Sequence, residues 1–198
     1  MTSSLRNASA VLVMDFQSEI VAMLGDAASS VIDHAAAVVK AARAAKIPVI
    51  YVVVGFRPGY PEIGPTSRWF AMVAQSGRFA SSDRPGSDVH PKLKPEESDV
   101  VIVKHRVSAF AHTDLDLILR AKSIDTLILT GIATSGVVLS TTRHAADADY
   151  KIVVVNDACA DGDAEVHRVL TEKVLARQAT VLSSVEVVEA MARAPEGK

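Results

Sequence analysis

Residues 126–142 read Thr-Leu-Ile-Leu-Thr-Gly-Ile-Ala-Thr-Ser-Gly-Val-Val-Leu-Ser-Thr-Thr. The first five predict a buried strand, the glycine marks a turn, and a helix is expected from about Ser135 to Ala148. A strand that turns sharply into a helix points several backbone N–H groups into one place, and the helix N-terminus adds partial positive charge. That is the physical basis of an oxyanion hole. The stretch therefore indicates an α/β fold with an anion-binding turn.

Apolar runs and helical patterns alternate along the rest of the chain. The predicted strands are Ala8–Phe16, Pro48–Val54, Asp99–Val103, Thr126–Thr130, Lys151–Val155 and Thr180–Ser183. The other predicted helices are Asp26–Lys46, Asp114–Lys122, Ala164–Ala176 and Val185–Arg193. The strands are continuously apolar, which is typical of parallel sheets covered on both faces. This order predicts a three-layer αβα fold with right-handed crossovers.

In such folds ligands bind beyond the carboxyl ends of the strands. Five residues stand at or just past predicted strand ends: Asp15, Gly55, Lys104, Gly131 and Asp157. A carboxylate there is desolvated, which raises its pKa and suits it to proton transfer. The alternatives are that Asp15 caps the next turn and that Lys104 returns to solvent.

Composition narrows the function classes. A chain of 198 residues predicts one domain, 1–198, and its net charge of −2 with few aromatic residues excludes a nucleic-acid footprint. The only cysteine, Cys159, cannot form an internal disulfide, which fits a reducing compartment. With neither a signal-peptide pattern nor an apolar run of membrane-spanning length, we expect a cytoplasmic protein that binds no membrane.

One segment interrupts the strand–helix alternation. Residues 55–97 are rich in Pro and Gly and contain Trp69 and Phe70. A loop this long inside a compact domain is usually functional or an interface. We interpret it as a lid or dimer arm within the domain, and we expect a homodimer or higher homo-oligomer.

The strand-end residues have a known counterpart. With Asp15 and Lys104, the sequence Gly-Ile-Ala-Thr-Ser-Gly-Val-Val at 131–138 resembles the isochorismatase-like, or cysteine hydrolase, family over nearly the whole chain. Val107-Ser-Ala-Phe110 and Thr113-Asp-Leu115 also match the family's pattern after its essential lysine. The resemblance implies a six-stranded parallel sheet of order 3-2-1-4-5-6. It also implies that Asp15 is the general acid/base and that Lys104 is its electrostatic partner.

The chain departs from the family at the nucleophile. The resemblance aligns Val137 with the catalytic cysteine of the family's amidases. Valine has neither a lone pair nor an acidic proton, so it cannot form a thioester. The family's isochorismatases carry Gly there and cleave a vinyl ether without an enzyme nucleophile. Val137 is bulkier than that Gly.

The turn and its surroundings supply the predicted binding residues. The resemblance implies a cis peptide between Ile132 and Ala133, with the amides of Ala133 and Val137 as anion donors. An ordinary turn capped by Thr134 or Ser135 is compatible with this. The predicted oxyanion and substrate-binding residues are Ala133, Ile132, Thr134, Gln17, Phe110 and Trp69.

Hydroxyl groups could replace the thiol only beside a base. The candidate hydroxyls are Thr134, Ser135 and Ser140, and the imidazoles near these motifs are His105, His112 and His144. Cys159 is interpreted as a small buried hydrophobe. The segment 52–60 lacks the metal ligands of the nicotinamidase branch, and no Gly-x-Gly-x-x-Gly follows a strand, so we expect neither a metal nor a cofactor.

Two functional hypotheses remain. The first is a Cys-less hydrolase that acts on a small carbonyl, amide or vinyl-ether compound by Asp/Lys acid–base chemistry. The second is an inactive family member that serves as a small-molecule binding or assembly protein. Loss of the nucleophile favours the second hypothesis, whereas retention of Asp15 and Lys104 favours the first.

Overall fold

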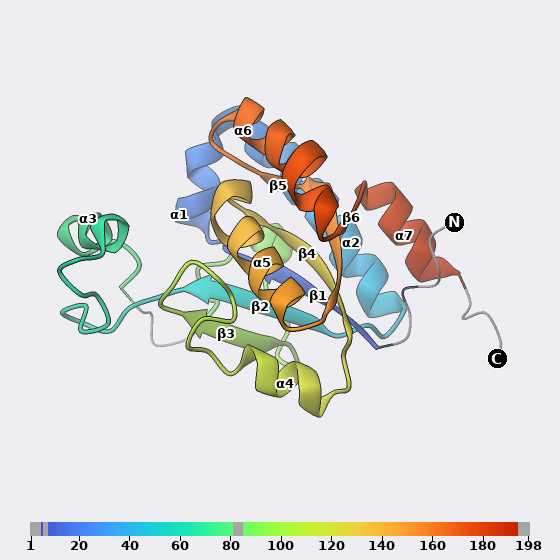
Figure 1. The fold of residues 1–198 in the computed structure, drawn as a ribbon, viewed down its shortest axis with the longest axis horizontal. Helices are drawn as coiled ribbons and strands as arrows, with labels where there is room; N and C mark the ends of the chain where they lie inside the picture. The colour runs from blue at the N-terminus through green and yellow to red at the C-terminus, as the bar shows by residue number, and fades with distance from the viewer. Residues whose placement is uncertain (1–4, 6–7, 81–84, 194–198) are drawn as a thin grey trace.

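A computed structural model describes residue 5 and residues 8–80 and 85–193 of the chain. It contains one six-stranded sheet of order β3-β2-β1-β4-β5-β6, in which every neighbouring pair is parallel (Figure 1). The strands are β1 (Ser9–Met14), β2 (Val49–Val54), β3 (Val100–Lys104), β4 (Thr126–Ile132), β5 (Lys151–Ala160) and β6 (Thr180–Leu182). The predicted fold class and strand order are confirmed.

Helices cover both faces of the sheet. They are α1 (Ser18–Val21), α2 (Ala28–Ala44), α3 (Arg68–Ser76), α4 (Leu115–Ala121), α5 (Leu139–Asp147), α6 (Ala164–Val169) and α7 (Ser184–Ala192). Helices α2 and α7 pack on one face, while α4 and α5 pack on the other (Figure 1). Strand β1 is buried throughout and sends Val11 and Val13 to the first face and Ala10, Leu12 and Met14 to the second. Burial on both faces explains why its sequence is continuously apolar.

Shorter turns accompany these helices. They are η1 (Ala22–Ala27), η2 (Pro91–Leu93), η3 (Thr134–Val138), η4 (Leu170–Val174) and η5 (Leu175–Arg177). The helix predicted from about Ser135 begins with η3, a π-helical turn in which Gly136 has non-helical angles of φ −97° and ψ −105°. The helix predicted at 164–176 is divided among α6, η4 and η5. The sequence therefore indicated where these helices lie but not how their turns are wound.

Strand β5 continues beyond its predicted end. Its pairing with β4 shifts between Leu129, which faces Val154, and Gly131, which faces Cys159, so β5 carries extra residues at this point. The bulge contains Asn156 and Asp157, whose polarity made the strand look finished at Val155. A bulge re-aims side chains without ending the strand.

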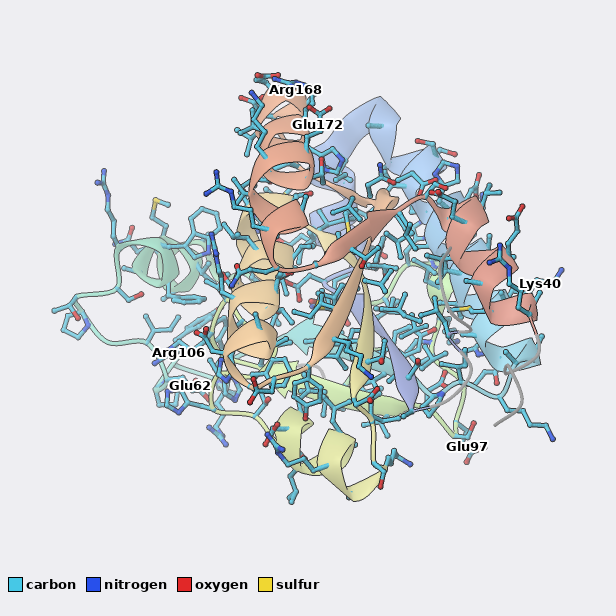
Figure 2. The ribbon with its side chains drawn as sticks, turned by 45° about the vertical axis from the view of Figure 1, so that its right-hand side comes forward. Lys40, Glu62, Glu97, Arg106, Arg168 and Glu172 are labelled. Atoms are coloured by element: carbon cyan, nitrogen blue, oxygen red, sulfur yellow. The ribbon has the colours of Figure 1, made fainter. Side chains whose placement is uncertain are left out.

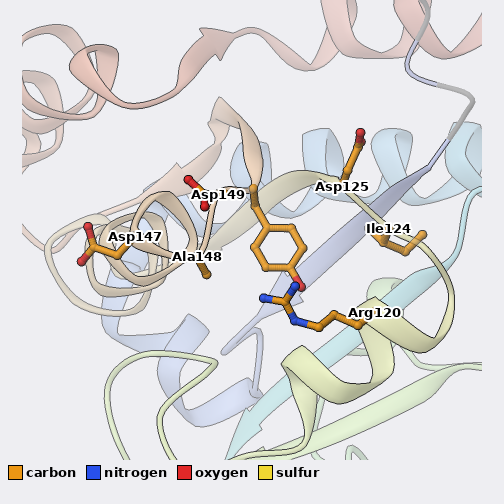
Figure 3. Close-up of a pocket in the computed structure, with 7 residues that line it drawn as sticks. Arg120, Ile124, Asp125, Asp147, Ala148 and Asp149 are labelled. Carbon is orange, nitrogen blue, oxygen red and sulfur yellow. The ribbon is translucent and has the colours of Figure 1, made fainter.

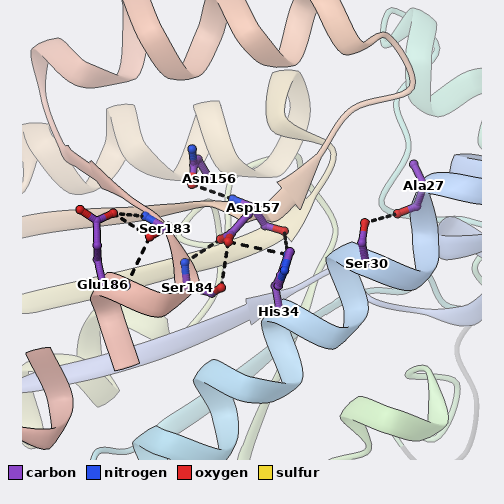
Figure 4. A network of polar contacts seen from close by, with 8 residues as sticks. All are labelled: Ala27, Ser30, His34, Asn156, Asp157, Ser183, Ser184 and Glu186. Atoms are coloured by element: carbon purple, nitrogen blue, oxygen red, sulfur yellow. Dashed lines mark hydrogen bonds and ion pairs between the residues drawn. The ribbon is translucent and has the colours of Figure 1, made fainter. Parts of the chain in front are cut away.

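Asp157 lies in this bulge and contacts residues of two helices, α2 and α7 (Figure 4). Its carboxylate accepts hydrogen bonds from the backbone N–H of Ser184 at 2.7 Å and from the Ser184 hydroxyl at 2.8 Å. The imidazole Nδ1 of His34, on α2, lies 3.0 Å from the Asp157 carbonyl oxygen. Asp157 is therefore the link between β5, α2 and the first turn of α7.

Residues 55–80 project from the end of β2 as an arm that carries α3 (Figure 1), whereas Val89 and Leu93 pack in the core cluster that contains α2. Phe70 and Val73 of α3 pack against Phe56 and Val54 in a small apolar cluster of their own. Trp69 points the other way and is 58% exposed. Within the described part of the chain, no helix combines the length and the apolar character needed to cross a bilayer.

Candidate active site

Asp15 and Lys104 meet in a buried ion pair. Lys104 Nζ lies 2.9 Å from Asp15 Oδ2, and the two side chains are 4% and 9% exposed for Lys104 and Asp15. The ammonium also donates to the Arg106 carbonyl oxygen at 3.1 Å. The predicted proximity of these two side chains is confirmed.

The sheet order explains why they meet. Strand β2 lies between β1 and β3, and its end residue Val54 is paired with Lys104. The Asp15 backbone N–H donates to the Val52 carbonyl at 2.8 Å, directly past the end of β1. Asp15 has a φ of +59°, a left-handed conformation that aspartate tolerates better than most residues. Lys104 therefore reaches across the end of β2 to a carboxylate held by a bent backbone.

Two opposing effects act on the pKa of Asp15, and its two carboxyl oxygens have different surroundings. Burial raises the pKa of Asp15 above its ordinary value, although the charge of Lys104 and its hydrogen bond act in the opposite direction. Asp15 Oδ1 is buried and has no hydrogen-bond partner among the described residues. A carboxyl group with one paired and one unpaired oxygen can accept or release a proton at the unpaired atom.

The turn after β4 has the shape predicted for it. The peptide bond between Ile132 and Ala133 is cis, which confirms that prediction. A side chain at Gly131 would place its Cβ 3.0 Å from the Met14 carbonyl oxygen and 3.3 Å from Val138 Cγ2. Only glycine therefore lets the turn lie this close to the end of β1.

Some backbone N–H groups of this turn already donate hydrogen bonds within the protein. Gly136 and Val138 donate their N–H groups to the Ala133 carbonyl oxygen at 3.1 and 3.3 Å. The Ser135 N–H donates to Asp161 Oδ2 at 2.7 Å. The amides of Ala133 and Val137 remain the candidate anion donors.

Sequence reasoning missed one imidazole at this turn. His167 Nδ1, on α6, lies 2.7 Å from Thr134 Oγ1, and Thr134 is fully buried. Burial lowers the pKa of His167, while Asp161 opposes that shift. Asp163 caps α6 and accepts hydrogen bonds from the Glu165 and Val166 N–H groups. The sequence carried no signal for the contact itself, because Thr134 and His167 are 33 residues apart.

Val137 is 2% exposed and packs in the core cluster that contains Met14 and Cys159. Cys159 is also buried, and burial raises the pKa of its thiol to about 12. Its Sγ lies 3.8 Å from the Leu129 carbonyl oxygen. A thiol that stays protonated at neutral pH is a poor nucleophile, in agreement with the structural interpretation of Cys159.

Comparison with known proteins identifies the family. The model of the isochorismatase domain matches residues 9–186. The isochorismatase family protein YecD of Escherichia coli O157:H7 is 32% identical over 185 residues, which cover 92% of this chain and 95% of YecD. The chain belongs to the isochorismatase family. A hydrolase of this family, the ureidoacrylate amidohydrolase RutB of Yersinia enterocolitica, is 34% identical over 172 residues and is matched over 75% of its length by 77% of this chain.

Solved structures of similar proteins agree with the fold. A cysteine hydrolase from Pseudomonas syringae pv. phaseolicola superposes with a TM-score of 0.84 at 27% identity, covering 94% of this chain and 93% of its own. The N-carbamoylsarcosine amidase of Thermoplasma acidophilum superposes with a TM-score of 0.72 at 30% identity, covering 89% and 96%. The protein is an isochorismatase-family hydrolase.

Three predicted binding residues of this isochorismatase-family chain have other contacts. Gln17 is buried and exchanges two hydrogen bonds with the Val54 backbone, at 2.9 and 2.8 Å, and donates to Asp88 Oδ2 at 2.6 Å. The Phe110 ring stacks on His144, with ring centroids 4.8 Å apart, and packs against Tyr150, the residue before β5. Trp69 is exposed on the arm. Gln17 and Phe110 therefore have the contacts of structural residues in the single chain.

The remaining imidazoles also have other surroundings. His105 Nδ1 lies 2.6 Å from the Gly55 carbonyl oxygen, and His112 is exposed. Among residues 8–80 and 85–193, no group of three His, Cys, Asp or Glu side chains is placed to hold a metal ion.

A separate surface pocket of about 400 Å³ lies at the amino ends of β4 and β5, as Figure 3 shows. It is lined by Arg120, Ile124, Asp125, Asp147, Ala148, Asp149 and Tyr150. Because Asp15 and Lys104 follow the carboxyl ends of their strands, this pocket is distinct from the candidate site.

Proposed function

We propose that this protein hydrolyses a small carbonyl, amide or vinyl-ether compound by acid–base chemistry of Asp15 and Lys104, with water in place of an enzyme nucleophile. The observation that carries the proposal is the buried, unpartnered Oδ1 of Asp15 beside an Oδ2 held by Lys104 at 2.9 Å. The ammonium stabilises the carboxylate, and no donor among the described residues reaches Oδ1. Oδ1 is therefore the atom from which a proton can move to or from a ligand.

For an amide, the proposed reaction balances with one water. Asp15 Oδ1 takes a proton from water as the water oxygen attacks the carbonyl carbon, and the amides of Ala133 and Val137 hold the resulting oxyanion. Asp15 then returns that proton to the leaving nitrogen as the C–N bond breaks. For a vinyl ether, protonated Asp15 delivers its proton to the vinyl carbon, and water adds to the resulting oxocarbenium ion while returning a proton to Asp15. The hemiketal then collapses: its hydroxyl proton passes to the leaving oxygen as the C–O bond breaks, which gives a carbonyl compound and an alcohol. The side chain of Val137 takes no part in either sequence.

The test is the substitution Asp15→Asn, with Asp125→Asn as the matched control. Asp125 pairs with Lys151 at 3.0 Å on the surface, so its loss removes the same charge far from the site. Across a panel of small amides, esters and vinyl ethers, Asp15→Asn should lower turnover by about 10²–10⁴-fold while ligand affinity stays within about tenfold. Turnover that survives Asp15→Asn unchanged would defeat the mechanism, and absence of wild-type turnover across the panel would favour the inactive binding or assembly protein.

A second variant tests whether the site can still support catalysis by a thiol at position 137. Val137→Cys would place a thiol near a helix N-terminus, a setting that lowers the thiol pKa. Gain of amidase or esterase activity, with a trappable acyl adduct on the new cysteine, is the expected result. Ser at the same position serves as the control, because a hydroxyl needs a base that this position does not provide.

A further inference from the structure

The turn after β4 is held from outside by the segment that follows β5. The last residues of β4 and β5 are paired with each other, so the chain leaves β5 beside this turn. Asp161, the next residue, accepts the Ser135 N–H at 2.7 Å, and His167 Nδ1 lies 2.7 Å from Thr134 Oγ1. The first two residues of η3 are therefore tied to a segment about 30 residues further along the chain.

The Thr134 hydroxyl depends on His167 for a partner. Thr134 has no exposed surface, and a buried hydroxyl is costly unless it is hydrogen-bonded. Burial lowers the pKa of His167, although the charge of Asp161 opposes this, and a neutral imidazole offers one donor and one acceptor nitrogen. A hydroxyl can bond to either. Because Thr134 is enclosed by protein, its hydroxyl serves the turn and does not replace the missing thiol.

Helix α6 is rotated so that His167 faces this turn. The next residue, Arg168, points to solvent and pairs with Glu165 and Glu172, each at 2.7 Å, and Figure 2 shows Arg168 and Glu172 on the outside of the molecule. Residues three and four apart share one face of a helix, whereas consecutive residues point about 100° apart. The charged outer face therefore leaves His167 on the inner side.

The turn that His167 holds is the one with the candidate anion donors. The Gly136 and Val138 N–H groups both donate to the Ala133 carbonyl oxygen, at 3.1 and 3.3 Å, which closes the turn. Thr134 lies between these groups in the chain, so a shift of Thr134 also shifts the amides of Ala133 and Val137. Donors of an oxyanion hole act only at about 2.7–3.1 Å from the oxygen, and a misplacement of about 1 Å can cost about 10²-fold in rate.

We propose that His167, acting through the Thr134 hydroxyl, is a positioning residue that sets where the Ala133 and Val137 amides point in the candidate active site. The inference rests on the proposed function for the reaction that those amides assist. It adds to the Asp15 site a residue of α6 that touches no reacting atom. Asp161 supports the same turn through Ser135.

The first test uses variants that break the contact from either end. Thr134→Val removes the hydroxyl and His167→Ala removes the imidazole, so a variant that fails to fold leaves the other. Thr134→Ser keeps the hydroxyl, and His167→Asn keeps a polar atom near the position of Nδ1. Thr126→Val is the matched control, because Thr126 is a buried threonine at the other end of β4 whose hydroxyl donates to Asp125 Oδ1 at 2.6 Å.

Amide hydrogen exchange followed by NMR measures the turn without any substrate. The Gly136 and Val138 N–H groups report whether the turn is closed, and the Leu129 N–H in the middle of β4 reports opening of the whole sheet. In Thr134→Val and His167→Ala, exchange at Gly136 and Val138 should rise about 10-fold more than exchange at Leu129. Thr134→Ser and Thr126→Val should not change this ratio, and His167→Asn should give an intermediate value.

Steady-state kinetics on a compound that the wild type hydrolyses is the second readout. Thr134→Val and His167→Ala should lower kcat by about 10- to 100-fold with KM within about threefold, because oxyanion donors act in the transition state. Thr134→Ser should restore kcat, whereas a loss of stability alone would not divide kcat from KM in this way.

The inference is overturned if exchange at Gly136 and Val138 follows that at Leu129 in both breaking variants, or if both variants keep the kcat of an active wild type. A wild type that hydrolyses no compound of the panel would refute the proposed function alone. The exchange ratios would then still decide whether His167 positions the turn.

Discussion

The substitution Lys104→Met measures how much the buried Asp15–Lys104 ion pair contributes to the free energy of unfolding. Methionine keeps an unbranched apolar stem of similar length and removes the ammonium. Asp15, 9% exposed at its side chain, would then have lost the partner of Oδ2 while Oδ1 already has none. Removing one partner of a buried ion pair typically costs about 3–5 kcal/mol. We expect Lys104→Met to lower the free energy of unfolding by about that amount at neutral pH.

The penalty should depend on pH with a defined sign. Burial raises the pKa of Asp15 from the ordinary 3.8, and Lys104 partly reverses the shift, so losing Lys104 raises the pKa further. A group whose pKa is raised in the folded state favours folding when protonated, and this advantage is lost as pH rises through the folded-state pKa. The destabilisation by Lys104→Met should therefore be larger at about pH 8 than at about pH 5.

Urea denaturation followed by far-ultraviolet circular dichroism measures both effects. The control is Lys151→Met, which breaks a pair of similar length, 3.0 Å, whose side chains are 75% and 53% exposed. Such exposed pairs contribute about 0–1 kcal/mol, so the control should change little at either pH. Equal, small effects of Lys104→Met and Lys151→Met at both pH values would refute the claim that the Asp15–Lys104 pair is desolvated.

Four further outcomes are expected. Gly131→Ala should destabilise the fold by about 1–3 kcal/mol, because its Cβ would crowd Met14 and Val138. The control is Gly64→Ala, whose Cβ meets nothing within 4 Å, and equal urea midpoints for the two variants would contradict the prediction. Cys159, with a pKa of about 12, should resist iodoacetamide in the folded protein and react in denaturant, as mass spectrometry can show; an acyl adduct on it would overturn its structural role. His167→Ala should cost about 1–3 kcal/mol by orphaning the Thr134 hydroxyl, and less in a Thr134→Val background, as a double-mutant cycle would measure. Light scattering at micromolar concentration should show a homo-oligomer that Trp69→Ser weakens, since Trp69 and Met72 are exposed on α3; a wild-type monomer would contradict it.

The strands were predictable from local sequence, whereas the strand order and the roles of Asp15 and Lys104 followed from the resemblance to the family. Each buried strand is a continuous apolar run, and parallel order places the residues that follow such runs at one edge of the sheet. The continuation of β5 beyond Val155 was not predictable, because the bulge at Asn156 and Asp157 depends on the pairing of β5 with β4. Register is a property of two strands together.

Side-chain partners distant in sequence were also beyond sequence reasoning. Gln17 was predicted to bind substrate, yet its amide contacts Val54 and Asp88, 37 and 71 residues away. His167 reaches Thr134 across 33 residues because α6 presents that face to the turn. The rotation of a helix about its axis is fixed by packing, so spacing along the chain could not select His167 over the other imidazoles.

The strand order has a consequence for how the chain is made. Strand β1 is the first to leave the ribosome, but its two neighbours in the sheet are β2 and β4, and β4 begins only at Thr126. Until then one edge of this wholly buried strand has no partner, and a free edge of this kind can pair with other chains. Domains generally fold as units during synthesis, so a nascent chain shorter than β4 would be the aggregation-prone species. Ribosome-bound fragments that end before and after residues 126–132 would differ sharply in protease resistance, and the Asp15–Lys104 contact would become stable only in the longer one.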